Sequence, residues 1–193
     1  QLYHPAEESV TKDLLKRAQL SGCKVLIILA DVPSFGYRPR DIRNGLAMPP
    51  KLSIKNVIQV LKRPEWALKT LINGQPSFEV LKPYMPKSLN LKQLAKFMDS
   101  TFSGRLNEEK IKKLRDSWKG KLVIKGTESI DDIEKAYKLG VDGVIISNHG
   151  GRQVDVGQAT VDSLKTIAPI YKGKLKTVSY THLRAHETNV YLV

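Results

Sequence analysis

The sequence predicts an α/β fold built on a parallel sheet. Short runs rich in apolar residues recur at residues 25–29, 122–126 and 144–147. Continuous apolar runs are typical of strands that are buried on both faces of a parallel sheet. Helical patterns separate the runs, and the second and third lie about 20 residues apart, which is enough for a crossover through one helix. Alternating strands and helices of this kind indicate βαβ units.

The first half of the chain begins with one such unit and continues into a long insertion. A helix is predicted at residues 7–20, where apolar residues recur at helical spacing and Gly22 follows as a stop signal. The strand at residues 25–29 comes next. Residues 30–104 then hold most of the prolines and a helical stretch at residues 92–98. Because this segment is longer than a connecting loop needs, we expect it to have a function of its own.

The second half alternates more regularly. Asn107 is predicted to cap a helix at residues 108–118, whose first turn is acidic, as the helix dipole favours. After the second strand, Thr127 is predicted to open another helix. The third strand follows, and then a helix at residues 160–171.

Charge is distributed unevenly along the chain. The 193 residues include 32 lysines and arginines against 19 acidic residues, a formal net charge of +13. Residues 51–125 alone hold 17 basic and 6 acidic residues, a net charge of +11. Three interpretations are open: a solvated helical surface, a nucleic-acid site, or attraction to an anionic membrane. We predict no nucleic-acid partner, because neither interleaved aromatic residues nor a recognisable binding module accompanies the charge.

Composition excludes several classes of protein. Hydrophobic residues at 41% and charged residues at 26% are values of a globular protein, neither disordered nor fibrous. No apolar run approaches the ~20 residues of a membrane-spanning helix. The single cysteine, Cys23, cannot form an internal disulfide, so we expect a reducing, cytoplasmic compartment. Because Cys23 stands at the start of an apolar run, we also expect its thiol to be buried and unreactive. No signal peptide is visible, although a missing start would hide one.

Polar residues gather where the predicted strands end. The carboxyl ends of parallel strands meet at one edge of a sheet, where α/β proteins bind their ligands. The residues at these ends include a tyrosine, a carboxylate, a lysine, a histidine and two arginines. They are Tyr3, Asp31, Arg38, Lys125, His149 and Arg152. Each alone is more often structural or solvated, but together they can bind an anionic substrate and move a proton.

Four short segments carry a more specific pattern. The most specific is SNHGGRQ at residues 147–153, followed by Val154 and Asp155. The others are QLY at the start of the chain, DVP followed by GYRPRDIRNG after the first strand, and LVIKG in the second strand. In this order they resemble the FMN-dependent L-2-hydroxy-acid oxidases and dehydrogenases, which include glycolate oxidase, flavin L-lactate dehydrogenase and mandelate dehydrogenase. Residues 63–74 look more like the quinone-linked lactate and mandelate dehydrogenases than the soluble oxidases.

The resemblance implies a TIM (β/α)8 barrel with FMN at its C-terminal face. On that pattern the chain is a partial barrel, from the end of strand 3 to the start of strand 7. Residues 1–178 would be a fragment of the FMN hydroxy-acid dehydrogenase domain, with a long insertion at residues 30–106 after strand 4. Residues 179–193 include SYTHLRAHET, similar to translated sequencing-adapter sequence, and we interpret them as an assembly artefact. We therefore predict no metal site, despite the spacing of His182 and His186.

The implied reaction is FMN-dependent oxidation of a small, lactate-like L-2-hydroxy acid to the 2-oxo acid. By resemblance, His149 is the catalytic base and Asp31 orients it. The substrate-binding residues would be Tyr3, Arg38, His149 and Arg152. The cofactor-binding positions would be Gln1, Leu29, Lys125 and Ser147. Leu29 stands where the family often has a threonine, which puts that one contact in doubt.

The resemblance also sets expectations about partners. The electron acceptor would be a quinone, a cytochrome or oxygen, and the full-length protein would be a homo-oligomer. It would be cytoplasmic, or peripheral on the inner face of the cytoplasmic membrane. Two alternatives stay open: this chain is an inactive truncated fragment, or the protein is a flavin-free, phosphate-binding TIM-barrel enzyme, which would not need the HGGR loop at residues 149–152.

Overall fold

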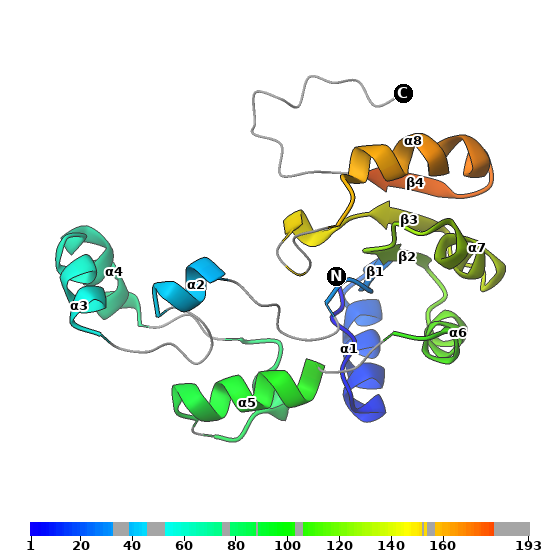
Figure 1. Ribbon diagram of the computed structural model, residues 1–193. Coiled ribbons are helices and arrows are strands. Elements are labelled where there is room, and N and C mark those ends of the chain that lie inside the picture. Colours follow the sequence, from blue (N-terminus) through cyan, green and yellow to red (C-terminus); the bar gives the residue numbers. More distant parts are fainter. Residues whose placement is uncertain are drawn as a thin grey trace. The chain divides into compact units, whose positions relative to one another are not determined.

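The computed structural model divides the chain into two compact units. The first contains Gln1–Tyr37 and Thr101–Val193, and the second contains Arg38–Ser100. The sheet lies in the first unit, whereas the second is helical (Figure 1). The residues that the structure describes are 1–32, 39–45, 53–74, 78–87, 89–102, 106–151, 153 and 157–179.

Parallel strands in sequential order make the sheet of the first unit. They are β1 (Val25–Leu29), β2 (Lys121–Lys125), β3 (Gly143–Ile146) and β4 (Lys176–Ser179). The register places Lys125 between Leu29 of β1 and Ile145 of β3. Ahead of β1, Leu2 forms an isolated parallel bridge to Ile28. The predicted parallel sheet is therefore confirmed.

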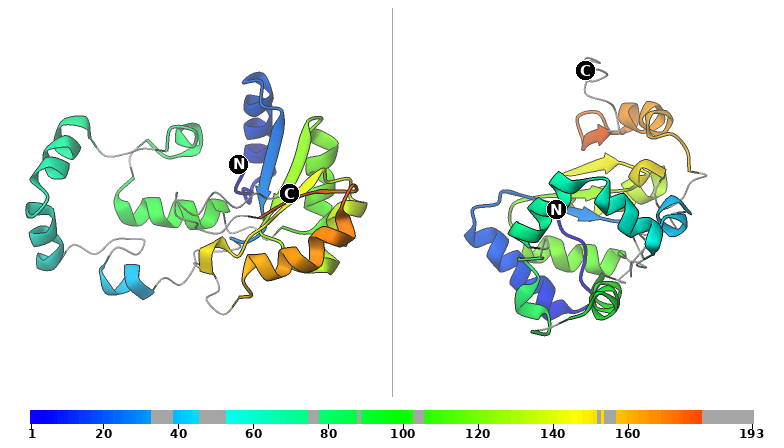
Figure 2. Two further views of the ribbon diagram at one scale, coloured as in Figure 1. Left: turned by 90° about the horizontal axis from the view of Figure 1, so that it is seen from above. Right: turned by 90° about the vertical axis from the view of Figure 1, so that its left-hand side faces the viewer.

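Helices from the first unit cover one face of this sheet (Figures 1 and 2). They are α1 (Glu8–Leu20), α6 (Glu108–Ser117), α7 (Ile130–Lys138) and α8 (Thr160–Tyr171). Asn107 caps α6 as predicted, because its side-chain oxygen accepts a 2.9 Å hydrogen bond from the Lys110 amide. Thr127 does not open α7, and Ser129 is the N-cap instead. The reason is that the Gly126 amide still bonds to the Ile145 carbonyl, so the chain has not yet left the sheet.

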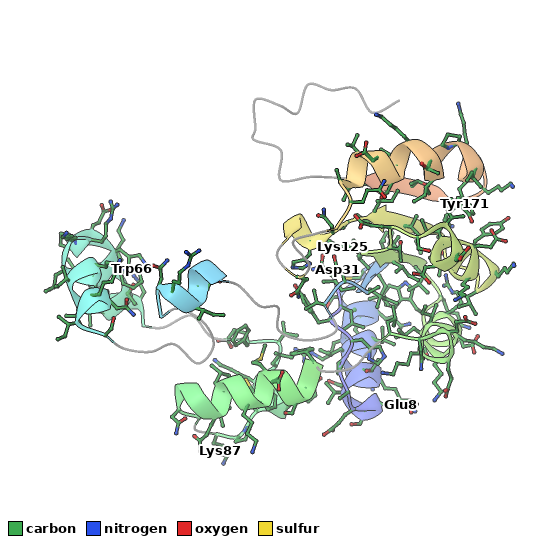
Figure 3. The ribbon with its side chains drawn as sticks, viewed as in Figure 1. Glu8, Asp31, Trp66, Lys87, Lys125 and Tyr171 are labelled. Carbon is green, nitrogen blue, oxygen red and sulfur yellow. The ribbon has the colours of Figure 1, made fainter. Side chains whose placement is uncertain are left out.

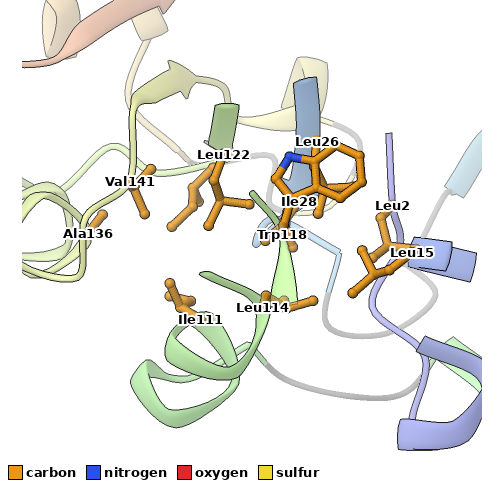
Figure 4. Packing of buried hydrophobic residues seen from close by; sticks show 11 residues of the cluster. Leu2, Leu15, Leu26, Ile28, Ile111, Leu114, Trp118, Leu122, Ala136 and Val141 are labelled. Atoms are coloured by element: carbon orange, nitrogen blue, oxygen red, sulfur yellow. The ribbon is translucent and has the colours of Figure 1, made fainter. Parts of the chain in front are cut away.

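The hydrophobic core lies between these helices and the sheet (Figure 4). Its larger part joins side chains of β1 and β2 to α1, α6 and α7, and it encloses Trp118, which is 1% exposed. A second part joins β3 to α7 and α8. Sequential strand order with the helices on one face is the arrangement of a (β/α)8 barrel and not of a doubly wound sheet. The four strands form a partial barrel of this kind.

The other face of the sheet departs from the prediction of burial on both faces. Ile27, Val123 and Ile145 point to this face and are only half-buried. In a closed barrel this face is the inside, which side chains from opposite strands fill. The described strands form only an arc, so these side chains have no opposite strand to pack against within the described part of the chain.

Cys23 is exposed, so the prediction of a buried thiol is wrong. It lies in the turn between α1 and β1, where its amide bonds to the Ala18 carbonyl. The apolar run begins only at Val25, which is itself 51% exposed at the edge of the sheet. Burial in this run starts with Leu26.

The second unit contains more helix than the sequence indicated. Its elements are α2 (Pro39–Arg43), α3 (Ile54–Leu61), α4 (Pro64–Asn73), the 3-10 helix η1 (Lys82–Tyr84) and α5 (Leu91–Phe102), whose last two residues belong to the first unit. The helix predicted at residues 92–98 is confirmed as part of α5. Local signals for the missed helices exist, since Ser53 caps α3 and Pro64 opens α4. In the described part of the chain, no helix is both long enough and apolar enough to cross a membrane.

Candidate active site

The carboxyl ends of three neighbouring strands bring four predicted residues together. Asp31 follows β1, Lys125 ends β2, and Ser147 follows β3. His149 opens the short 3-10 turn η2 (His149–Gly151), which comes next in the chain. Figure 3 labels Asp31 and Lys125 close together beside the strand ends. The predicted gathering of polar side chains at this edge is therefore present.

One carboxylate oxygen is the centre of the cluster. Asp31 Oδ2 accepts hydrogen bonds from Lys125 Nζ at 2.8 Å and from Ser147 Oγ at 3.3 Å. His149 Nδ1 lies 3.2 Å from the same oxygen. Lys125 Nζ also donates to Ser147 Oγ at 3.0 Å, and the His149 amide donates to this hydroxyl at 3.1 Å. Ser147 thus connects the lysine, the acid and the backbone of the histidine.

Burial makes these contacts strong and costly to break. The side chain of Lys125 is 5% exposed and that of Asp31 is 8% exposed. A buried ion pair is maintained only where hydrogen bonds offset the loss of hydration, and Ser147 supplies them here. The His149 ring is not aligned for a hydrogen bond to Asp31. The contact is therefore electrostatic, and it is attractive when the imidazole is protonated.

The backbone of the histidine loop explains how the ring reaches the acid. His149, Gly150 and Gly151 have φ angles of 56°, 65° and 67°, all in the left-handed region. Such a conformation costs about 1 kcal/mol or more for a residue with a side chain, and glycine adopts it freely. Asn148 supports the turn by accepting a 3.0 Å hydrogen bond from the Gly150 amide. The two glycines let the chain turn back sharply, so that the imidazole lies beside Asp31.

Glu128 is a member of this neighbourhood that the sequence analysis missed. It lies in the loop between β2 and α7, three residues after Lys125. Burial and, secondarily, the negative charge of Asp31 raise the pKa of the Glu128 carboxyl. Its Oε1 is buried without a hydrogen-bond partner in the described structure. The sequence did carry a signal for this residue: Glu128 is an acidic residue soon after the end of β2, as Asp31 is after β1.

The other predicted residues make no side-chain hydrogen bond or ion pair with the cluster in the described part of the chain. Tyr3 is 40% exposed and makes an edge-to-face contact with Phe102, with ring centroids 6.1 Å apart. Gln1 is exposed at the start of the chain. Leu29 is buried and pairs with Lys125 across the sheet, so it is next to the cluster without a polar group to add. Arg38, Arg152, His182 and His186 lie outside the described residues.

The polar groups at this edge suit a cofactor that both donates and accepts hydrogen bonds. Lys125 supplies a buried ammonium group at the carboxyl end of its strand, and Ser147 adds a hydroxyl. Asp31 Oδ1 and Thr127 Oγ1 are buried polar atoms without partners among the described residues. Buried polar atoms in proteins are normally paired, so such atoms are ones that a bound group can satisfy. The residues present therefore fit a flavin.

Comparison with known sequences decides the family. The profile of the FMN-dependent dehydrogenase family matches residues 1–179. The chain belongs to this family. It is 32% identical over 185 residues to the L-lactate dehydrogenase of Haemophilus influenzae strain PittEE. The matched region is 95% of this chain and 48% of that relative. It is 30% identical to the L-lactate dehydrogenase of Bartonella quintana strain Toulouse, over 96% of this chain and 48% of that relative.

Solved structures agree with this assignment. The structure of the monotopic membrane protein (S)-mandelate dehydrogenase is similar with a TM-score of 0.84 at 30% identity, over 95% of this chain and 48% of that one. The structure of a mandelate oxidase with (S)-4-hydroxymandelic acid is similar with a TM-score of 0.69 at 25% identity, over 95% of this chain and 46% of that one. The chain spans about half the length of the curated relatives it matches. The cofactor of this dehydrogenase family is FMN.

Proposed function

We propose that this protein oxidises a small, lactate-like L-2-hydroxy acid to the 2-oxo acid, with FMN as cofactor and His149 as base. The observation that carries the proposal is the position of Asp31 Oδ2, which lies within 3.3 Å of Lys125, Ser147 and His149. Membership of the FMN-dependent dehydrogenase family supports it. The two named relatives in this family are L-lactate dehydrogenases.

His149 would move the proton. In the reaction the C2–H and O–H bonds of the substrate break and a C=O bond forms, which releases two electrons and two protons. FMN, when bound, would take up the two electrons together with one of the protons, and His149 would hold the other. Because Nδ1 faces Asp31, Nε2 is the imidazole nitrogen left to accept a proton from the substrate. Asp31 then stabilises the imidazolium, as a carboxylate does in a catalytic triad.

The remaining residues would bind and orient the cofactor and the substrate. Lys125 and Ser147 would hold the polar edge of the cofactor, and Leu29 would offer an apolar contact beside them. Arg38 and Arg152 would hold the substrate carboxylate, since a guanidinium group can bind both carboxylate oxygens. Tyr3 would hydrogen-bond the substrate, and Gln1 would contact the flavin. These roles rest on the matched sequence segments.

The test is turnover of L-lactate with an artificial electron acceptor, in preparations with equal bound flavin. His149→Gln should lower turnover by at least about 10²-fold, the lower range for loss of a general base. His4→Gln is the matched control, because His4 lies beside Lys110 and lacks a carboxylate partner in the described structure. Turnover of the His149 variant close to that of the unsubstituted protein would refute the assignment.

A second candidate concerns the 193 residues by themselves, which we propose neither hold FMN nor turn over a hydroxy acid. The half-buried Ile27, Val123 and Ile145 favour it, because this open face is one that a closed barrel would cover. Among the described residues, β4 pairs with a strand on one side only and the outer side of β1 pairs with Leu2 alone, and such edges invite association between chains. The test is purification of the chain in the presence of FMN. A monomeric, flavin-bound preparation that lactate reduces would refute this candidate.

The proposal includes a membrane surface among the partners. It is supported by the net charge of +11 in residues 51–125 and by the similarity to a monotopic membrane protein. Attraction to anionic lipid is worth about 1 kcal/mol for each basic residue near the surface. The protein would then be peripheral on the inner face of the cytoplasmic membrane. A quinone or cytochrome could be reached there, and oxygen would be the acceptor of a soluble form.

A further inference from the structure

Asn148 connects the two ends of the loop that contains His149. Its Oδ1 accepts a 3.0 Å hydrogen bond from the Gly150 amide, which we call the turn bond. Its Nδ2 donates a 3.1 Å hydrogen bond to the Gln158 carbonyl, which we call the closure bond. Because a backbone amide can only donate and a carbonyl can only accept, both bonds form in one orientation of the side-chain amide. A single side chain therefore joins the start of the loop to a residue ten positions further along the chain.

The turn bond holds the backbone around His149. A bond from an asparagine side chain to the amide two residues further on is an Asx turn. The residue inside this turn is His149, whose φ angle of 56° is uncommon for a residue with a side chain. Such a conformation persists only where the surroundings impose it. The Gly151 amide also donates a 3.1 Å bond to the Asn148 carbonyl, so two bonds hold the turn.

The closure bond ties the loop to a packed element. Gln158 lies two residues before α8. The beginning of α8 is buried, since Thr160 and Ser163 are 2% and 4% exposed, and Ile167 of the same helix belongs to the core. Packing therefore anchors the far end of the loop, and the closure bond connects Asn148 to that anchor. Joining the ends of a loop in this way reduces the number of conformations that it can adopt.

The position of the His149 ring depends on this backbone. The ring makes no aligned hydrogen bond to Asp31, although Nδ1 lies 3.2 Å from Oδ2. The backbone must therefore place the ring beside the acid. The His149 amide donates to Ser147 Oγ at 3.1 Å, and the next amide, that of Gly150, donates to Asn148. Two consecutive side chains thus hold the two amides on either side of the His149 α-carbon.

The choice of an asparagine separates the two bonds. An aspartate or a serine at this position would also supply the acceptor of an Asx-type turn. Only the side-chain amide has a donor as well, and the closure bond uses that donor. The side chain of Asn148 therefore does more than form a turn.

We propose that Asn148 is a positioning residue for the oxidation: the turn bond and the closure bond together keep the backbone of His149 in place, so that the imidazole stays beside Asp31. The inference rests on the proposed function, because a displaced ring lowers turnover only if His149 is the base. Asn148 exchanges no proton with the substrate and acts only through His149.

The experiment compares three variants of the full-length protein loaded with FMN. Asn148→Ser keeps a neutral acceptor for the turn bond and loses the donor of the closure bond. Asn148→Ala loses both bonds. Asn107→Ala is the matched control, because it removes a 2.9 Å bond of the same kind, from the Lys110 amide to the Asn107 side chain at the start of α6. The measured quantities are bound flavin, the urea midpoint, kcat with L-lactate, and hydrogen exchange of the Gly150 amide.

Asn148→Ala should lower kcat by roughly tenfold or more at equal bound flavin, because a small misplacement of a catalytic group has a large effect on the rate. Asn148→Ser should have a kcat between those of Asn148→Ala and the wild type. Asn107→Ala should lose about as much stability as Asn148→Ala and yet keep kcat within about twofold, because its lost bond only caps a helix. The Gly150 amide should exchange faster in Asn148→Ala than in the wild type, and at the wild-type rate in Asn107→Ala.

Each contrary result overturns a stated part of the inference. Equal kcat losses in Asn148→Ala and Asn107→Ala would make the effect a general destabilisation and overturn the positioning role. A wild-type kcat in Asn148→Ser would overturn the part assigned to the closure bond. A wild-type kcat in Asn148→Ala, with His149→Gln still impaired, would overturn the whole inference and leave the proposed function intact.

The exchange measurement separates this inference from the proposed function, because it requires no turnover. If His149→Gln itself retains turnover, the proposed function fails and with it the catalytic meaning of Asn148. Exchange of the Gly150 amide then still decides whether Asn148 holds the backbone of His149. Unchanged exchange in Asn148→Ala would overturn that statement as well.

Discussion

Asp31 lies directly against Gly126, and a Cβ at position 126 would overlap Cβ and Cγ of Asp31. Gly126 also has a φ angle of +95°, a conformation that favours glycine. The end of β2 therefore leaves open the space that the Asp31 side chain occupies. This close packing lets the carboxylate reach Lys125 and lie beside His149.

Gly126→Ala should displace Asp31 and destabilise the first unit. The overlap and the unfavourable φ angle together should lower the free energy of unfolding by about 3 kcal/mol. Urea denaturation followed by circular dichroism would measure the loss. Gly173→Ala is the matched control, because Gly173 has φ +79° with no heavy atom near its added Cβ. Gly173→Ala should lower the free energy of unfolding by only about 1 kcal/mol. Equal losses in the two variants would argue against close packing of Asp31 on Gly126.

Lys125→Met should be more harmful than removal of the whole ion pair. The single substitution leaves the Asp31 carboxylate buried without its cation, which should cost about 3 kcal/mol of unfolding free energy. The double variant Asp31→Asn and Lys125→Met has no buried charge left, so part of that loss should be recovered. The measurement is a double-mutant cycle by urea unfolding. Additive losses would show that the two groups do not stabilise each other.

Glu128 should make the protein less stable as the pH rises above about 4.5. Burial and the charge of Asp31 raise the pKa of Glu128 above its ordinary value of 4.5. Between the unfolded and folded pKa values the folded state holds more protons, so the free energy of unfolding falls as pH increases. Glu128→Gln removes this dependence, and the variant should exceed the wild type in stability at pH 7 but not at pH 4. The urea midpoints of both proteins at pH 4 and pH 7 test this prediction. A stability difference between Glu128→Gln and the wild type that is the same at both pH values would contradict it.

Asp142 should have the opposite pH dependence at the other end of the sheet. Its carboxylate accepts hydrogen bonds from Arg115 Nη1 and Lys121 Nζ, both at 2.8 Å, and from the Leu122 amide at 2.9 Å. Burial acts to raise the pKa of Asp142, but the bonds from Lys121 and the Leu122 amide outweigh it and hold the pKa below 3.8.

The stability that Asp142 contributes is therefore present above pH 3.8 and is lost as the pH falls through the lower, folded pKa. Asp142→Asn should cost about 2 kcal/mol at pH 7, because the charged hydrogen bonds weaken. The cost should shrink in acid, where the wild-type carboxylate is itself protonated. Thermal melts of the wild type and of Asp142→Asn at neutral and acid pH would measure this change in cost. A cost independent of pH would mean that the charge of Asp142 does not matter.

The sequence by itself determined the local elements of this protein. Apolar runs placed every boundary of β1, β2 and β3 to within one residue, and the side chain of Asn107 caps α6 as its position indicated. These features depend on neighbours within a few residues, which the sequence states directly. The order of strands and helices then limited the fold to an α/β class, and the motif SNHGGRQ indicated the family that the profile match established.

Only the tertiary structure decided which residues meet and which are covered. Asp31 lies 94 positions from Lys125 and 116 from Ser147, and parallel pairing brings their strand ends together. The effect of Asp31 on Glu128, the exposure of Cys23 and the outward faces of α3 and α4 were not evident from the pattern. A sequence shows that a helix has an apolar face, but burial depends on what the rest of the chain brings against that face.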